Sequence, residues 1–350
     1  MPLIPRPLRR KTYTLHHALV VGLVIIVVGC GLIAGLFSLP AILADQVSRI
    51  GTTPNGELAA FPVTVDPERK VIIEDPEVNA YLDGPHSPLQ AAAITSGGAL
   101  SQVLAWIATA IAATPAYEAV AATNARFVTI EPGMRKEQVA SAFGSVLGWS
   151  ASEKKAFETA QRFSTLPLPE GSFSPGIYLV EPDTTPVQAQ ALVNERFSNE
   201  ILKRYGKDTA AVVPLNDALT VASLIEREAG GPDDMRLISG IIWNRLFSGM
   251  RLQIDATLQY VKAEKPSTKT WWPPVATTDK FIKSPYNTYL NEGLPPGPIA
   301  NPSVAAVIAA LNPKQTDCMY YFHDKFSGIH CSVTYEEHVA LLKKYYGRGK

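Results

Sequence analysis

Cysteine is scarce in this chain of 350 residues, which contains only Cys30, Cys318 and Cys331. Because Cys30 lies inside an apolar N-terminal run, a disulfide-built framework is excluded, and a single Cys318–Cys331 bridge is the most that could form. The two cysteines flank an expected hairpin without standing opposite each other. The sequence therefore disfavours this bridge.

An excess of charge is also lacking. Lys and Arg total 32, as do Asp and Glu, so the net charge is zero. Nucleic-acid binders carry a basic footprint, so we expect no nucleic-acid partner. The spacing of His323, His330 and His338 matches no zinc-binding pattern. We therefore expect neither a metal ion nor a cofactor.

One long hydrophobic run is present. Residues 18–44, ALVVGLVIIVVGCGLIAGLFSLPAILA, carry no charge and exceed the roughly 20 apolar residues that cross a bilayer. Basic residues precede the run, so the positive-inside rule predicts residues 1–17 in the cytoplasm and the rest of the chain outside. A cleaved signal peptide, or a lipoprotein site at VVGC, is the alternative, but the run is long for either.

The middle of the chain predicts small mixed elements. Residues 45–120 form a poorly assigned juxtamembrane region, with one or two strands in FPVTV and KVIIE and a soluble helix in the Ala-rich SQVLAWIATAIAA. Residues 121–200 predict a small α+β module with a strand at RFVTI, two helices, a strand after EGSFSPG and a long helix capped by threonines.

Residues 201–350 predict a mainly helical domain. PLNDALTVASLIEREAGG reads as a helix with Asn216 as its N-cap and a glycine stop, and PDDMRLISGIIWNRLFSG reads as a second helix. A Pro-rich loop region is expected over 251–302. SVAAVIAALNP predicts a third helix, MYYFHDKFSGIHCSV a β-hairpin, and TYEEHVALLKKYY a closing helix. The fold class expected for the whole chain is α+β.

Two glutamates near the end of the first of these helices are candidates for chemistry. A helical side chain covers the residues three and four positions before it, so Glu228 faces Leu224 and Ile225, a bulkier apolar collar than Glu226 has. A carboxyl in apolar surroundings keeps its proton more tightly, as a general acid requires. The alternative is that both glutamates are solvated charges at a helix end.

Ordered motifs between 221 and 302 carry a resemblance. VASLIEREAG, GIIWNRLFSGMRLQIDATLQY and SPYNTYLNEGLPPGPIANPS follow one another, and this series resembles the MltG/YceG-like family of membrane-anchored endolytic murein transglycosylases. YYFHDKFSGIHCSVTYEEH resembles the closing hairpin and helix of that family. FVTIEPGM and EGSFSPGIYLV resemble its LysM-like module, which corresponds to residues 121–200 here.

The resemblance implies cleavage of peptidoglycan between N-acetylmuramic acid and N-acetylglucosamine, with a 1,6-anhydromuramyl end. It implies that Glu228 is catalytic and that residues 201–350 form the catalytic domain. The family usually has threonine after this glutamate, whereas Ala229 stands here, so a hydroxyl that could orient the carboxyl is missing.

Several polar residues of the same motifs are predicted to bind substrate: Asn244, Arg245, Gln253, Asp255, Tyr286, Asn287, Tyr289 and His330. Asp255 is either a second carboxylate or a turn residue, and Arg245 clamps either Asp255 or a sugar, or forms a structural ion pair. Tyr286–Tyr289 either contact sugar or fix the following loop. Trp271 and Trp272 either stack on sugars or plug a gap.

The expected partners are peptidoglycan strands, the cytoplasmic membrane and, from the resemblance, glycan-polymerising synthases. Localisation is predicted as single-pass in the bacterial cytoplasmic membrane, with the catalytic domain on the outer side. Two other functions stay open: a membrane-tethered peptidoglycan-binding scaffold without catalysis, and a muramidase that adds water through Asp255.

Overall fold

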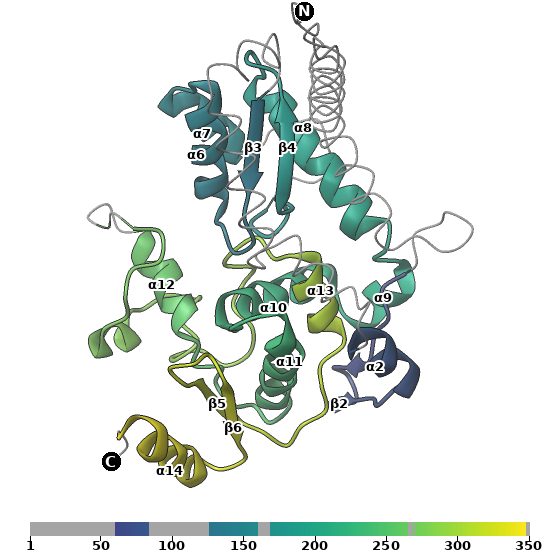
Figure 1. Ribbon diagram of the computed structural model, residues 1–350, viewed down its shortest axis with the longest axis vertical. Helices are drawn as coiled ribbons and strands as arrows, with labels where there is room; N and C mark the ends of the chain where they lie inside the picture. The colour runs from purple at the N-terminus through teal and green to yellow at the C-terminus, as the bar shows by residue number, and fades with distance from the viewer. Residues whose placement is uncertain (1–59, 84–125, 160–168, 265–267, 269, 348–350) are drawn as a thin grey trace, which may run out of the picture. The chain divides into compact units, whose positions relative to one another are not determined.

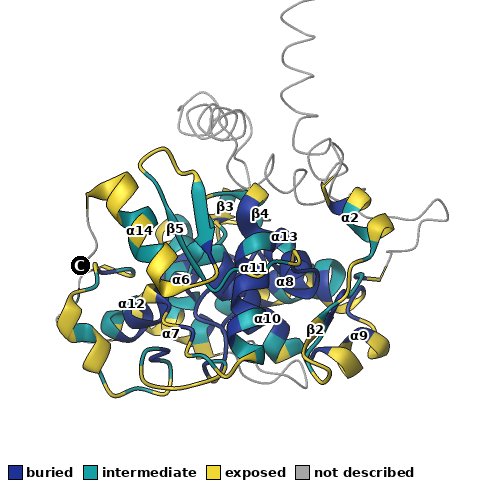
Figure 2. Ribbon diagram, turned by 90° about the horizontal axis from the view of Figure 1, so that it is seen from below, coloured by how far each residue is buried: buried dark blue, intermediate teal, exposed yellow. Residues whose placement is uncertain are grey.

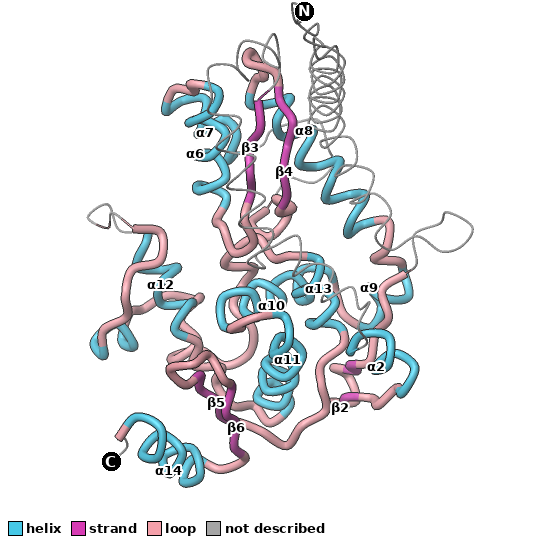
Figure 3. Tube along the Cα trace, in the orientation of Figure 1, coloured by secondary structure: helices cyan, strands magenta, loops and turns pink. Residues whose placement is uncertain are grey.

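The computed structural model describes residues 60–83, 126–159, 169–264, 268 and 270–347. All of them belong to one compact unit, Leu58–Lys350. This unit is α+β and mainly helical, and three antiparallel two-stranded sheets lie in its described part (Figure 1, Figure 3). The apolar run at 18–44 and the helix expected at 101–113 lie outside the described residues. Within the described ranges, no helix combines the length and apolar character needed to cross a bilayer.

The first described segment packs on the C-terminal core. Strand β1 (Val65–Asp66) pairs with β2 (Val71–Ile72) as the alternating runs predicted, and helix α2 (Pro76–Asp83) follows, which the sequence did not predict. Residues Phe61, Val65 and Leu82 are buried in the same apolar cluster as helices α10 (Leu215–Glu228) and α13 (Val304–Leu311).

A β-α-α-β unit comes next, and its own apolar core is separate from the C-terminal one. Its elements are β3 (Arg126–Ile130), α6 (Lys136–Leu147), α7 (Ala151–Thr159) and β4 (Gly176–Val180). The strands are antiparallel, with Phe127 opposite Leu179. The buried faces of the strands and the helices enclose the rings of Phe143, Trp149 and Phe157.

Helix α8 (Pro186–Phe197) leads from this unit to the C-terminal core. Thr185 caps its start by accepting a hydrogen bond from the Gln188 amide, which confirms the expected threonine cap. The helix runs directly into the π-helical η1 (Ser198–Leu202), and α9 (Lys207–Val212) follows. The domain boundary that the sequence suggested between residues 200 and 201 therefore lies inside a continuous helical segment.

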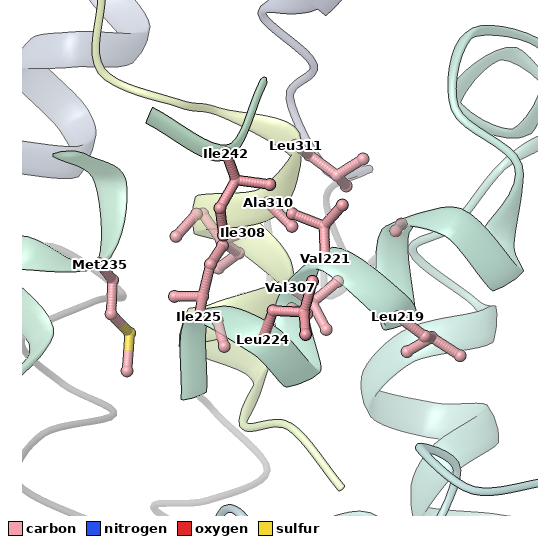
Figure 4. Close-up of a cluster of buried hydrophobic side chains, with 14 of the residues drawn as sticks. Leu219, Val221, Leu224, Ile225, Met235, Ile242, Val307, Ile308, Ala310 and Leu311 are labelled. Atoms are coloured by element: carbon pink, nitrogen blue, oxygen red, sulfur yellow. The ribbon is translucent and has the colours of Figure 1, made fainter. Parts of the chain in front are cut away.

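The C-terminal core is built on three helices, α10 (Leu215–Glu228), α11 (Pro232–Phe247) and α13 (Val304–Leu311). Figure 4 shows apolar side chains of α10 and α13 meeting across their crossing, and Figure 2 shows buried residues concentrated on α10, α11 and α13. The Asn216 N-cap prediction is wrong, because the carbonyl of Pro214 already accepts the amides of Asp217 and Ala218, which moves the cap to Pro214.

The region expected to be a loop over 251–302 contains a helix, α12 (Asp255–Ala263), and a 3-10 turn, η2 (Thr277–Phe281). After α13 the predicted hairpin forms from β5 (Tyr320–His323) and β6 (Ile329–Ser332), and α14 (Tyr335–Tyr346) closes the described chain. Residues Thr288 and Ile254 hold the start of α12, since the Ile254 amide donates to the Thr288 hydroxyl at 2.9 Å.

The cysteines do form a bridge, which the sequence disfavoured. Cys318 and Cys331 are disulfide-bonded with their Cα atoms 5.8 Å apart. Cys331 stands opposite Tyr321 in the hairpin, so the cysteines are not directly opposite, as expected. They nevertheless meet because Cys318 lies before β5, so its position is not fixed by the residue pairing of the two strands.

Asn301 joins the β-α-α-β unit to the C-terminal part of the chain. Its side-chain oxygen accepts the amides of Gly171 and Phe173, both at 2.9 Å. Its side-chain nitrogen donates to the carbonyl of Met134 at 2.8 Å and to the carboxyl of Glu170 at 3.0 Å. Asn301 is completely buried, so these four hydrogen bonds replace its hydration.

A close approach between α11 and the segment before β5 predicts a stability effect. A Cβ atom on Gly240 would stand 2.2 Å from the carbonyl oxygen of Lys314, a backbone atom that cannot turn away. We expect Gly240→Ala to lower the free energy of unfolding by about 1–3 kcal/mol despite alanine's higher helix propensity. Urea unfolding measures this.

Gly206→Ala is the matched control, because a Cβ there meets nothing within 4 Å and φ is −66°. The steric explanation is wrong if the two variants unfold at the same urea concentration.

Candidate active site

Glu228 is the last residue of α10, and the turn after it is tightly fixed. Ala229 leaves the helix in an extended conformation. The amides of Gly230 and Gly231 both donate to the carboxylate of Asp234, at 3.0 and 3.2 Å, which seats them at the start of α11. The position of Glu228 is therefore set by two helices at once.

Glu228 is half-buried as a residue, and its carboxyl lies in protein surroundings. Its Oε2 accepts a hydrogen bond from the Tyr321 hydroxyl at 2.7 Å, and the backbone amide of Ala256 also faces it. Burial raises the pKa of Glu228, the charge of Asp255 raises it further, and the Tyr321 and Ala256 hydrogen bonds oppose the rise. A carboxylate at a helix C-terminus is disfavoured as well. This is the environment of a carboxylic acid that stays protonated above its ordinary pKa.

Glu226 is also turned into the protein, but it has a structural task. Its Oε2 accepts the Ser303 amide at 2.9 Å and the Ser303 hydroxyl at 2.7 Å, at the start of α13. Burial raises the pKa of Glu226 too. The reading of both glutamates as solvated charges is wrong, since neither side chain is exposed.

Two of the predicted substrate residues lie at the start of α12, on the chain that faces Glu228. Asp255 is exposed and accepts a hydrogen bond from the Tyr289 hydroxyl at 2.6 Å. Gln253 is exposed as well and has a left-handed backbone with φ at 52°. Its backbone amide donates a hydrogen bond to the Thr288 carbonyl at 3.1 Å, which holds it in place. Asp255, Tyr289 and Gln253 are thus placed to meet a ligand.

Asn244 and Arg245 instead hold the chain that leads into the hairpin. Asn244 donates to the carbonyls of Thr316 and Cys318 at 2.6 and 3.2 Å. The buried Arg245 donates to the carbonyls of Met319 and Leu252. A clamp on Asp255, one of the alternatives for Arg245, is not among these hydrogen bonds, because the guanidinium donates to backbone carbonyls instead.

Asn287 and Tyr286 shape the loop, as one of the two alternatives had it. Asn287 is fully buried, donates to the carbonyls of Lys280 and Ile282 at 3.1 and 2.7 Å, and accepts the Tyr289 amide at 2.9 Å. The Tyr286 ring packs on Tyr260 with centroids 4.9 Å apart. The Asn287 side chain is thus fully used within the loop, whereas Tyr286 stays half-buried.

His330 lies on the far side of the hairpin from Glu228. Side chains alternate along a strand, and His330 is paired and stacked with Phe322, whereas the neighbouring Tyr321 reaches Glu228. The His330 ring contacts Asp324 at 2.8 Å and packs on Tyr345 of α14. His330 is therefore turned away from Glu228 rather than toward it.

The two tryptophans differ: Trp272 plugs a gap in the protein, and Trp271 is exposed enough to stack on a sugar. The Arg227 guanidinium lies 4.0 Å from the Trp272 ring centroid, and the Trp272 ring nitrogen donates to Gln138 of α6 at 3.2 Å. Trp272 therefore fills a gap between the β-α-α-β unit and α10. Trp271 is 40% exposed and remains available for stacking.

The sequence missed Tyr321 and the pair His323–Asp234. Tyr321 and His323 point to one face of β5, and His323 Nε2 lies 2.6 Å from the Asp234 carboxylate. Alternation in YYFH gives the signal that these two residues share a face. Which face meets Glu228 depends on the docking of the hairpin, which no local pattern encodes.

Comparison with known proteins identifies the family. The model of the YceG-like family matches residues 97–344, so this chain belongs to the YceG-like family. It is similar to proteins named endolytic murein transglycosylase. The one from Bacillus subtilis (strain 168) is 34% identical over 179 residues, 50% of this chain and 48% of that protein.

A second such protein, from Streptococcus pneumoniae serotype 2 (strain D39), is 31% identical over 173 residues, 48% of this chain and 31% of that protein. The matches thus span less than half the length of these curated relatives. A crystal structure of a YceG-like protein from Listeria monocytogenes is 26% identical with a TM-score of 0.48, and the match covers 78% of this chain and 92% of that one.

Proposed function

We propose that this protein is an endolytic lytic transglycosylase that cleaves peptidoglycan strands between N-acetylmuramic acid and N-acetylglucosamine. The observation that carries the proposal is the half-buried Glu228, whose carboxyl pKa is raised by burial and which lies near the exposed Asp255. Membership of the YceG-like family and similarity to proteins named endolytic murein transglycosylase support it.

In this mechanism Glu228 acts first as an acid and then as a base. The protonated carboxyl gives its proton to the glycosidic oxygen as the bond to the muramyl anomeric carbon breaks. The C6 hydroxyl of the same muramyl residue attacks that carbon, and the Glu228 carboxylate takes the hydroxyl proton. The proton count closes, no water enters the product, and the carboxyl is regenerated.

Asp255 and Tyr289 form the second polar group of the site. A negative charge on Asp255 stabilises the oxocarbenium character that develops at the anomeric carbon. Tyr289 holds that carboxylate through its hydroxyl. Gln253 offers both a donor and an acceptor to an N-acetyl group, and Trp271 offers an aromatic face to a sugar ring.

We further propose the finer organisation of the chain. Residues 18–44 anchor it in the cytoplasmic membrane with residues 1–17 inside, and the catalytic domain, residues 201–350, lies outside the cytoplasm. The unit within residues 121–200 is a LysM-like module that binds glycan, supported by its β-α-α-β order and antiparallel strand pairing. Glycan-polymerising synthases are the proposed protein partners.

Product mass tests the reaction. Purified peptidoglycan is digested with the purified full-length chain, and the released strands are analysed by mass spectrometry. We expect 1,6-anhydromuramyl ends, each lighter by one water than a reducing end. Reducing ends would instead show a hydrolase that uses water, and binding of glycan without release of any product would show a scaffold.

A further inference from the structure

The hairpin β5–β6 brings one hydroxyl group, that of Tyr321, into hydrogen-bonding contact with Glu228. Tyr321 donates to Oε2 of that carboxyl at 2.7 Å from the face of β5 that is turned toward α10. The preceding residue, Tyr320, packs on Tyr335 and His338 of α14, with ring centroids 5.7 and 5.6 Å apart. The two tyrosines therefore have opposite orientations on one strand.

The chain that delivers Tyr321 is held firmly to α11. Arg245 donates to the carbonyl of Met319 at 2.7 Å, two residues before Tyr321. Asn244 donates to the carbonyl of Cys318, and Cys318 is covalently joined to Cys331 on the other strand. The phenol thus has little freedom to follow a carboxyl that turns away.

A hydrogen bond to one carboxyl oxygen distinguishes the two oxygens of the acid. When Glu228 is protonated, its carbonyl oxygen is the better acceptor, so the hydrogen bond from the phenol to Oε2 favours the proton on the other oxygen, Oε1. Only a proton on the oxygen that faces the sugar is useful to a general acid. The bond also stops rotation of the carboxyl between acid and base steps.

We propose that Tyr321 is the positioning residue of this enzyme: its hydroxyl fixes Glu228 Oε2 so that Oε1 exchanges the proton with the substrate. This inference rests on the glycan cleavage proposed above. Tyr321 contacts the carboxyl of Glu228 and acts through it.

Other charged and titratable groups face Glu228 from each element packed against it. They are Asp255 of α12, Arg245 of α11, His323 of β5, Tyr289 of the loop after η2, and Arg227 of α10 itself. Replacing Tyr321 by phenylalanine leaves all of these in place and removes one hydroxyl. The change in proton affinity can then be assigned to that hydroxyl.

The test compares Tyr321→Phe with Tyr320→Phe in the full-length protein, on soluble glycan strands, over a range of pH. A hydrogen bond from a phenol favours the carboxylate, so its loss raises the pKa of Glu228 further. We expect the limb at which kcat falls with rising pH to move to higher pH in Tyr321→Phe. We also expect kcat at its optimum to fall by about 10–100-fold, a part of what a positioned general acid contributes, with KM nearly unchanged.

In Tyr320→Phe, the pH at which kcat falls and the value of kcat at its optimum should both stay as in the unaltered protein. The proposal is overturned if Tyr321→Phe keeps the limb in place, or if kcat falls only in step with a lowered unfolding temperature, since that marks a purely structural role. It is equally overturned if Tyr320→Phe gives the same shift.

A titration without turnover separates this inference from the proposed reaction. Carboxyl carbon NMR of protein labelled at glutamate, with the Glu228 signal assigned by its absence in Glu228→Gln, follows the pKa of Glu228 directly. A rise in Tyr321→Phe supports the positioning contact even in a protein that releases no product, and an unchanged titration overturns it even in a protein that cleaves.

Discussion

Replacement of Glu228 by glutamine is expected to abolish cleavage of glycan strands, with a loss in kcat of roughly 10³-fold or more. Glutamine keeps the size of the side chain and can still accept from Tyr321, but it has no proton to give to the glycosidic oxygen. Glycan binding should be retained, because the residues exposed beside Glu228 are unaltered. Release of anhydro-ended products from purified peptidoglycan measures the loss.

The matched control is Glu226→Gln, two residues earlier on the same helix. Burial raises the pKa of both glutamates, so a general effect of removing a desolvated acid would appear in both variants. Glutamine at 226 can still accept from Ser303, and its kcat should stay within about twofold of the unaltered protein. Equal losses in the two variants would falsify the assignment of Glu228 as the acid.

If the proposed reaction holds, the unaltered protein should also lose activity as pH rises. The acid must begin the cycle protonated, so kcat/KM falls through the pKa of free Glu228, which burial places above the ordinary value for glutamate. A fall that begins already near the ordinary glutamate pKa would contradict the buried acid.

Asn301→Ala is expected to cause the second large effect, a loss of stability of about 3–5 kcal/mol. The substitution leaves the buried amides of Gly171 and Phe173 without an acceptor, and each unpaired buried group costs about 1–3 kcal/mol. Glu170, which burial gives a pKa of about 8, loses a donor at the same time. The unfolding temperature should fall by roughly 10 °C.

Asn216→Ala provides the comparison for this loss. Asn216 is exposed and its side chain makes one long hydrogen bond, 3.5 Å to the Pro296 carbonyl, so its removal should cost no more than about 0.5 kcal/mol. If the free energy of unfolding of Asn301→Ala lies within about 1 kcal/mol of that of the unaltered protein, the amides of Gly171 and Phe173 have found other partners. The hydrogen bonds of Asn301 would then not be what stabilises the β-α-α-β unit against the C-terminal part.

The regular elements were largely predictable because their signals are local. Threonine before α8, the segment PDDMRLISGIIWNRLFSG and the segment MYYFHDKFSGIHCSV predicted a helix start, a second helix and a hairpin, and each is present. Helix α12 was missed because its apolar pattern spans only nine residues and is followed by a Pro-rich segment. Its start depends on Thr288, 34 residues away, whose hydroxyl accepts the Ile254 amide.

The candidate site shows the same division between local and distant causes. The apolar collar of Leu224 and Ile225 correctly placed Glu228 in protein surroundings, but it also implied a more exposed Glu226. Glu226 is drawn in by Ser303, a partner 77 residues further on. Tyr321 is even further from Glu228 along the chain, so local periodicity had no means to connect the two.

The bridge between Cys318 and Cys331 restricts where a working molecule can be made. Thiols stay reduced in the cytosol of most cells, whereas disulfides persist in secretory and extracytoplasmic compartments. Protein produced in a reducing host cytosol is therefore expected to lack this disulfide in the hairpin that carries Tyr321, the residue that contacts Glu228. Recombinant material is best exported, or reoxidised after lysis, before its turnover is compared with that of the native source.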